Sequence, residues 1–155
     1  VEKGRRHVMM VLPDARYSFA QHLRHGVVSA AREAGIRYEL PGDVHLDIPP
    51  AETVAWLKRR FAEGDRPDGI VCVGEVSAIG TLAAITDSGL RLGTDLDVVA
   101  KRASSIFDLL RPSIDTVFED LWAAGRSMGE VLLRSMTGEA TGDLQVLHSP
   151  KLEFL

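Results

Sequence analysis

The chain has 155 residues, of which 45% are hydrophobic and 26% charged, a composition typical of a globular domain. Eighteen basic residues against 22 acidic ones give a formal net charge of −4 without any block of like charge, which argues against nucleic-acid binding by the overall surface. A single cysteine, Cys72, excludes an internal disulfide framework and a cysteine-based zinc site. Because no apolar segment of signal-peptide or membrane-spanning length is present, we expect a cytoplasmic protein without membrane contact.

Strand-like and helix-like segments alternate along the chain. Short apolar runs closed by turn residues predict buried strands, which we place at residues 7–12, 70–73, 96–100, 114–117 and 144–148. Apolar residues that recur at spacings of three and four predict helices, which we place at residues 18–34, 50–63, 76–88 and 118–137. Residues 36–50 include the turn signal Pro41-Gly42 and are expected to be irregular.

Terminal signals at two helices support this division. Gly35 stands where a left-handed C-cap would end the first helix, and Thr116 with Glu119 has capping-box spacing before the last one. No Asn-Gly or Asp-Gly hairpin turn joins adjacent apolar runs. The pattern therefore predicts an α/β protein, with a mostly parallel sheet between helices in three layers, α/β/α.

Charged side chains gather in the loops that follow the predicted strands. In an open parallel sheet, ligands bind outside the carboxyl ends of the strands, where these loops converge. The candidate ligand-binding residues in the loops are Arg16, Tyr17, Glu75, Lys101 and Arg102. One interpretation is a pocket for a polar ligand. The other is a set of solvated loop charges, with Glu75 paired to a neighbouring base.

Longer stretches of the sequence resemble a known family. The run Pro67–Gly80, the segment Ser88–Val99 and the segment Leu109–Val117 follow one another in register, and each is similar to the effector-binding domain of LacI/GalR-type bacterial transcription regulators. The resemblance covers nearly the whole chain. It implies a type I periplasmic-binding-protein-like fold in two lobes, of which this chain would be mainly the C-terminal lobe.

The resemblance also implies a domain organisation and a set of partners. Residues 1–117 would form the C-terminal lobe, residues 118–143 a crossover helix that packs on a missing N-terminal lobe, and residues 144–155 a C-terminal strand or tail. In such regulators a small-molecule effector, usually a sugar, closes the lobes and shifts a homodimer between operator-binding and non-binding states. The chain would reach operator DNA only through a missing N-terminal domain. No cofactor is implied.

Departures from the family pattern fall on the ligand site. Gly74-Glu75 stands where the family usually has Asn-Asp, and Ala100-Lys101-Arg102 where it typically has Gly-Phe-Asp. An arginine cannot accept hydrogen bonds from sugar hydroxyls, but it binds carboxylates and phosphates well. We therefore hypothesise an anionic effector, such as a sugar acid or a sugar phosphate. Leu23 replaces a usual arginine on the first helix, and Arg24 and Arg16 are the candidates to substitute for it.

Other constellations favour neither an enzyme nor a metal site. His22 and His25 have a spacing that suits a metal, but no third ligand accompanies them, so surface histidines are expected. Cys72 lies between valines and is expected to be a buried hydrophobe. Residues 74–80 match neither a Walker loop nor a dinucleotide turn. The alternative function is a solute-binding protein of a sugar transporter, which shares the fold.

The last predicted helix carries an apolar stripe that includes Leu121, Met128 and Leu132. Because the lobe that would cover this stripe is expected to be missing, we predict that the isolated chain self-associates through residues 118–137. A dimer contact around the first helix and the helix that begins at Val76, as the resemblance implies, is the competing surface.

Overall fold

The computed structural model describes residues 3–45, 48–139 and 141–154, and the six strands within these ranges form one sheet in the order β2-β1-β3-β4-β5-β6. The strands are β1 (His7–Val11), β2 (Arg37–Glu39), β3 (Gly69–Cys72), β4 (Asp97–Arg102), β5 (Asp115–Phe118) and β6 (Lys151–Glu153). Strands β1 to β5 are parallel to their neighbours, and β6 pairs antiparallel with β5. The expected mostly parallel sheet is confirmed.

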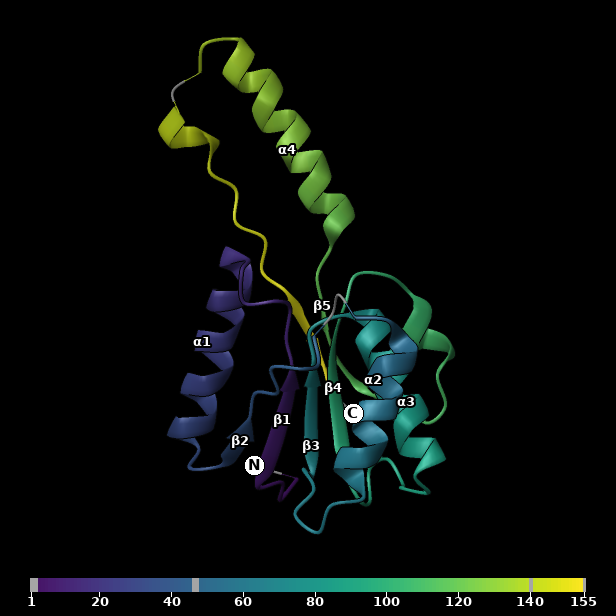
Figure 1. The fold of residues 1–155 in the computed structure, drawn as a ribbon. Coiled ribbons are helices and arrows are strands. Elements are labelled where there is room, and N and C mark those ends of the chain that lie inside the picture. The colour runs from purple at the N-terminus through teal and green to yellow at the C-terminus, as the bar shows by residue number, and fades with distance from the viewer. Residues whose placement is uncertain (1–2, 46–47, 140, 155) are drawn as a thin grey trace.

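Helices cover both faces of this sheet (Figure 1). The α-helices are α1 (Ser18–Glu33), α2 (Pro50–Phe61), α3 (Glu75–Asp87) and α4 (Leu121–Met136), and short 3-10 turns occur at Ile106–Leu109 and Thr141–Leu144. Helix α1 packs on one face of the sheet, and α2 and α3 lie together on the other. This arrangement confirms the predicted three layers, α/β/α.

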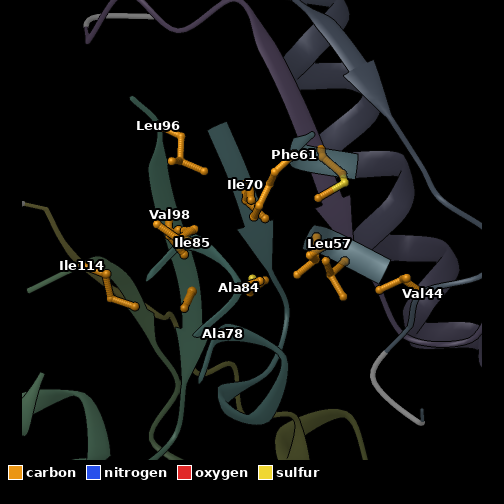
Figure 2. Close-up of a cluster of buried hydrophobic side chains, with 14 of the residues drawn as sticks. Val44, Leu57, Phe61, Ile70, Ala78, Ala84, Ile85, Leu96, Val98 and Ile114 are labelled. Carbon is orange, nitrogen blue, oxygen red and sulfur yellow. The ribbon is translucent and has the colours of Figure 1, made fainter. Parts of the chain in front are cut away.

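Alternation along the strands divides the core between these two faces. In β1, Met9 and Val11 belong to the larger cluster with Leu57 of α2, whereas Met10 belongs to the smaller cluster with Ala31 of α1. Figure 2 shows the larger cluster, in which side chains from the helices meet side chains from the strands. Because successive side chains of β1 are buried on opposite faces, the strand is a continuous apolar run in the sequence.

Two strands differ from the sequence expectation. The region 36–50 is not wholly irregular, because Arg37–Glu39 forms β2 at one edge of the sheet. Three residues are too few to show a hydrophobic period. The strand expected at residues 144–148 is wrong, because pairing with β5 begins only at Lys151, after the chain has returned to the sheet.

The observed ends of two helices show which of the predicted capping signals are correct. Gly35 has a φ of +62°, which confirms the left-handed C-cap after α1. The capping box is wrong, because Thr116 lies inside β5. Asp120 caps α4 instead, and its Oδ1 accepts a hydrogen bond of 2.8 Å from the backbone N–H of Ala123.

Helix α4 lies beyond the carboxyl end of the sheet rather than against it (Figure 1). None of its residues is buried, and Trp122 and Met136 are 73% and 76% exposed. Within the part of the chain that the structure describes, no helix is long and apolar enough to cross a membrane.

Candidate functional site

The carboxyl ends of β1, β3 and β4 lie at one edge of the sheet because these strands are parallel neighbours. The loop from β1 to α1, the start of α3 and the loop after β4 all begin at this edge. Each of them carries or adjoins at least one of the candidate residues, so the fold brings the candidates to the same side of the molecule.

The loop between β1 and α1 presents an arginine and an aromatic ring. The backbone N–H of Arg16 donates a 2.9 Å hydrogen bond to Asp14 Oδ1, and its guanidinium carbon lies 5.0 Å from the centre of the Tyr17 ring. Tyr17 in turn stacks on Phe19, with 5.7 Å between ring centres. Arg16 and Tyr17 are exposed, so this stack forms a surface at the start of α1 that a ligand can reach.

A cavity of about 210 Å³ lies beside this loop, between α1, the end of β1 and the chain after β2. Arg24 lines it together with Asp14, Gln21 and His45, and the lining includes the apolar Leu12. Complete small-molecule sites usually measure about 300–1,000 Å³. The cavity therefore has the size of a part of such a site, with polar groups on its walls.

Glu75, the first residue of α3, holds the loop that follows β4. Its Oε1 accepts hydrogen bonds from the backbone N–H of Ala103 (2.9 Å), the backbone N–H of Ser104 (2.8 Å) and the Ser104 hydroxyl (2.9 Å). Burial alone would raise the pKa of this carboxyl, but these hydrogen bonds outweigh it and hold the pKa below its ordinary value. Glu75 is thus an ionised side chain that shapes the edge of the site.

Lys101 and Arg102, at the end of β4, are both paired with carboxylates of this chain. Lys101 Nζ lies 2.8 Å from Oε2 of Glu119, which follows β5. Arg102 donates from Nε (3.0 Å) and Nη2 (2.5 Å) to Oε2 of Glu153 in β6. The two acidic residues thus lie on the segments that connect the sheet with α4, one leaving β5 and one in the strand that returns.

The guanidinium of Arg102 has further contacts. Nη1 donates a 2.7 Å hydrogen bond to the carbonyl oxygen of Ser104, and the guanidinium carbon lies 4.6 Å from the centre of the Phe118 ring. Thr116 completes the group, because its hydroxyl lies 3.3 Å from Arg102 Nε and donates a 2.9 Å hydrogen bond to Glu153 Oε2. The Arg102 side chain is only 13% exposed.

The six candidates therefore form two groups rather than one cluster. Arg16, Tyr17 and Arg24 belong to the β1–α1 loop and α1, whereas Glu75, Lys101 and Arg102 belong to the start of α3 and the end of β4. Sequence reasoning missed several participants, which are Gln21, His45, Glu119 and Glu153. His45 follows β2, and because that strand of three residues shows no hydrophobic period, its loop could not be placed at this edge from the sequence. Glu153 had no local signal, because its pairing depends on the register of β6 with β5.

The remaining chemistry-bearing residues stand apart from this edge. Cys72 is fully buried, and burial raises the pKa of its thiol to about 11, so it remains protonated. His22 and His25 are exposed on α1. Among residues 3–45, 48–139 and 141–154, no three histidine, cysteine or acidic side chains are grouped to hold a metal ion.

Comparison with known proteins identifies the family. The sequence model of the periplasmic binding protein-like domain matches residues 1–154. The chain belongs to the periplasmic binding protein-like domain family. A curated relative, catabolite control protein A of Staphylococcus aureus (strain N315), is 22% identical over 156 residues. That match covers 99% of this chain and 46% of the relative, so the chain spans about half the length of this relative.

Solved structures agree with this periplasmic binding protein-like fold. A regulatory protein of the LacI family from Chloroflexus aggregans superposes with a TM-score of 0.86 at 21% identity, covering 97% of this chain and 54% of that one. A LacI family transcriptional regulator from Arthrobacter sp. FB24, in complex with lactose, gives a TM-score of 0.80 at 20% identity, covering 97% and 56%. These comparisons confirm the resemblance to LacI-type regulators over nearly the whole chain.

Proposed function

We propose that the chain is an effector-binding lobe of a LacI-type transcription regulator. The observation that carries this proposal is the carboxyl edge of an open parallel sheet, with a cavity of mixed polar and apolar lining and exposed Arg16 and Tyr17, on a chain whose family match spans residues 1–154. The relative and the two structural neighbours described above are named as control or regulatory proteins, which supports a regulator over a transporter's solute-binding protein. No catalytic role is part of the proposal.

The proposed domain organisation follows the sequence expectation. Residues 1–117 form the C-terminal lobe, residues 118–143 carry the crossover helix, and residues 144–155 are the C-terminal strand or tail. In this proposal the effector is bound between this lobe and a second one, and lobe closure shifts a homodimer between two states that differ in operator affinity. The exposed α4, which lies outside the sheet lobe, supports this division (Figure 1).

The proposed effector is a small anionic metabolite, such as a sugar acid or a sugar phosphate. Arg24 on the cavity wall and Arg16 beside it supply guanidinium groups at this edge, and Arg102 supplies a third, which is paired with Glu153. Arginine binds planar oxyanions with paired N–H donors. The lactose complex of the Arthrobacter regulator supports a carbohydrate-like ligand for a lobe of this fold.

A calorimetric screen of the protein encoded by the whole gene tests this function. The panel contains neutral sugars, sugar acids and sugar phosphates, and operator binding is measured with and without each compound that binds. We expect Arg24→Gln to weaken the binding of the effector, while Arg126→Gln, on exposed α4, leaves it unchanged. Preference for a neutral sugar that is unaffected by Arg102→Ala would contradict the anionic class, and no effect on DNA binding would contradict the regulator.

A further inference from the structure

The pair formed by Arg102 and Glu153 joins the end of β4 to the last strand of the chain. Both Arg102 donors that reach Glu153 end on the same oxygen, Oε2, which also accepts the hydrogen bond from Thr116. An arginine–carboxylate pair supported by a third donor is a strong charge-assisted contact. The candidate anion-binding group of the site is therefore already occupied by a carboxylate of the chain itself.

Glu153 lies where it can be displaced. Its side chain is 43% exposed, whereas the side chain of Arg102 is 13% exposed. All three residues of β6 are exposed, and the strand pairs with β5 only through Thr116–Phe118. A pairing of three exposed residues opens locally at small cost in free energy. The arginine is thus the fixed member of the pair and the glutamate the mobile one.

We propose that Glu153 is a resident ligand of Arg102, which a phosphorylated effector displaces, and that this exchange releases β6 from β5. The inference rests on the proposed function and adds to it the effector's charged group and a route from the site to α4. Arg102 contacts Phe118 in β5 and Glu153 in β6, so its ligand determines whether the two strands stay joined at this point.

The chemistry of the exchange selects a phosphate over a carboxylate. Glu153 is tethered, so its effective concentration at Arg102 is in the millimolar range or above. A free carboxylate offers the guanidinium the same bonds without the tether, and Glu153 outcompetes it. A phosphate group carries a charge of about −1.5 to −2 near pH 7 and three strong acceptor oxygens, so it forms stronger contacts with the same guanidinium.

The exchange also acts on the segments that lead to α4. When Glu153 leaves, β6 loses its side-chain links to Arg102 and Thr116, and the short backbone pairing with β5 that is left then opens locally. The chain between the second 3-10 turn and β6 then gains freedom relative to the sheet. Effector binding at the edge of the lobe is thereby linked to the position of α4.

Phosphate binding to variants of the whole protein tests the proposal. Inorganic phosphate is titrated with phosphorus NMR detection, and acetate serves as the carboxylate control. We expect Glu153→Gln to bind phosphate at least tenfold more tightly than the unsubstituted protein, and acetate also to bind measurably. Glu139→Gln, which removes a carboxylate paired with Arg134 on α4, is the matched control and should change neither affinity. Adding Arg102→Gln to Glu153→Gln should abolish the gain.

Hydrogen exchange provides a readout that needs no substitution. In the unsubstituted protein, saturating phosphate should speed amide exchange at residues 151–153 and leave β3 unchanged. Equal phosphate affinity in Glu153→Gln and the unsubstituted protein would overturn the proposal, as would unchanged exchange in β6. If only neutral sugars bind in the calorimetric screen and phosphate binds neither protein, this exchange and the anionic class fail, whereas the regulator function stands.

Discussion

The sheet lobe and helix α4 use similar sequence patterns but are stabilised in different ways. Leu57 of α2 is completely buried, whereas Leu132 of α4 is 61% exposed, although both lie on apolar stripes of amphipathic helices. Helix α2 is stabilised by packing on the sheet. Helix α4 depends on local contacts, chiefly the Asp120 cap and exposed ion pairs such as Arg126–Glu130. A hydrophobic period therefore identifies a helix and its apolar face, but not whether the structure buries that face.

The largest expected difference comes from truncating one leucine in each region. Leu57→Ala should lower the free energy of unfolding of the lobe by about 2–5 kcal/mol, because it removes buried methyl groups and leaves a cavity. Leu132→Ala should change it by less than about 0.5 kcal/mol, as expected for an exposed site. Urea denaturation followed by circular dichroism measures both. Equal losses would show that the two helices share one cooperative unit.

A smaller effect is expected inside the lobe at Glu75. Glu75→Ala removes the acceptor of three hydrogen bonds and leaves the N–H groups of Ala103 and Ser104 without this partner. We expect a loss of about 1.5–3 kcal/mol, because a hydrogen bond to a charged group contributes about this much. Amide exchange at residues 103 and 104 should accelerate while α4 is unaffected. Unchanged exchange there would contradict the role given to Glu75.

The corresponding change in α4 is at its cap. Asp120→Ala should cost about 1 kcal/mol of helix stability, because the N–H of Ala123 loses its side-chain acceptor. The effect should appear as faster amide exchange in the first turn of α4. The unfolding midpoint of the lobe should stay the same, and a drop in that midpoint would mean that α4 and the sheet unfold together. Asp120→Asn, which keeps an acceptor, is the matched control.

The smallest expected effect concerns pH at the junction between the two regions. Hydrogen bonds from Arg102 and then Thr116 lower the pKa of Glu153 below its ordinary value. Its contribution to stability is therefore fully present above the ordinary glutamate pKa of about 4.3 and is lost as pH falls through the lower pKa of the folded state. Amide exchange in β6 should accelerate over this acidic range. Glu153→Gln should remove that pH dependence, and its persistence would assign it to another group.

Much of the fold was predictable because β1, β3 and β4 are apolar on both faces. The connecting helices were predictable from their hydrophobic periods. The end of α1 was predictable from Gly35, whose positive φ fits the expected C-cap. Strands β2 and β6 could not be found this way, because each has three residues and lies at an edge of the sheet. Their existence depends on the neighbour they pair with rather than on their own composition.

The candidate site was predictable in place but not in detail. Topology alone puts Arg16, Glu75 and Arg102 at the carboxyl edge, because each follows or ends a parallel strand. The ion-pair partner of Arg102 could not be inferred from the sequence, because Glu153 is 51 positions away and contacts Arg102 only through the register of β6. A basic residue in a loop thus indicates a potential anion site, while its ion pairs within the fold decide how that site is used.

Strand β6 also affects how the protein behaves towards other copies of itself. Paired with β5, it satisfies backbone groups of Thr116–Phe118 that would otherwise form an open edge of the sheet. Its own outer side is short and bears Lys151 and Glu153, features that discourage edge-to-edge pairing between molecules. Any change that detaches β6 exposes the longer parallel sheet as a template for intermolecular strand addition. The pairing of β6 with β5 therefore protects the protein against aggregation through this edge of the sheet.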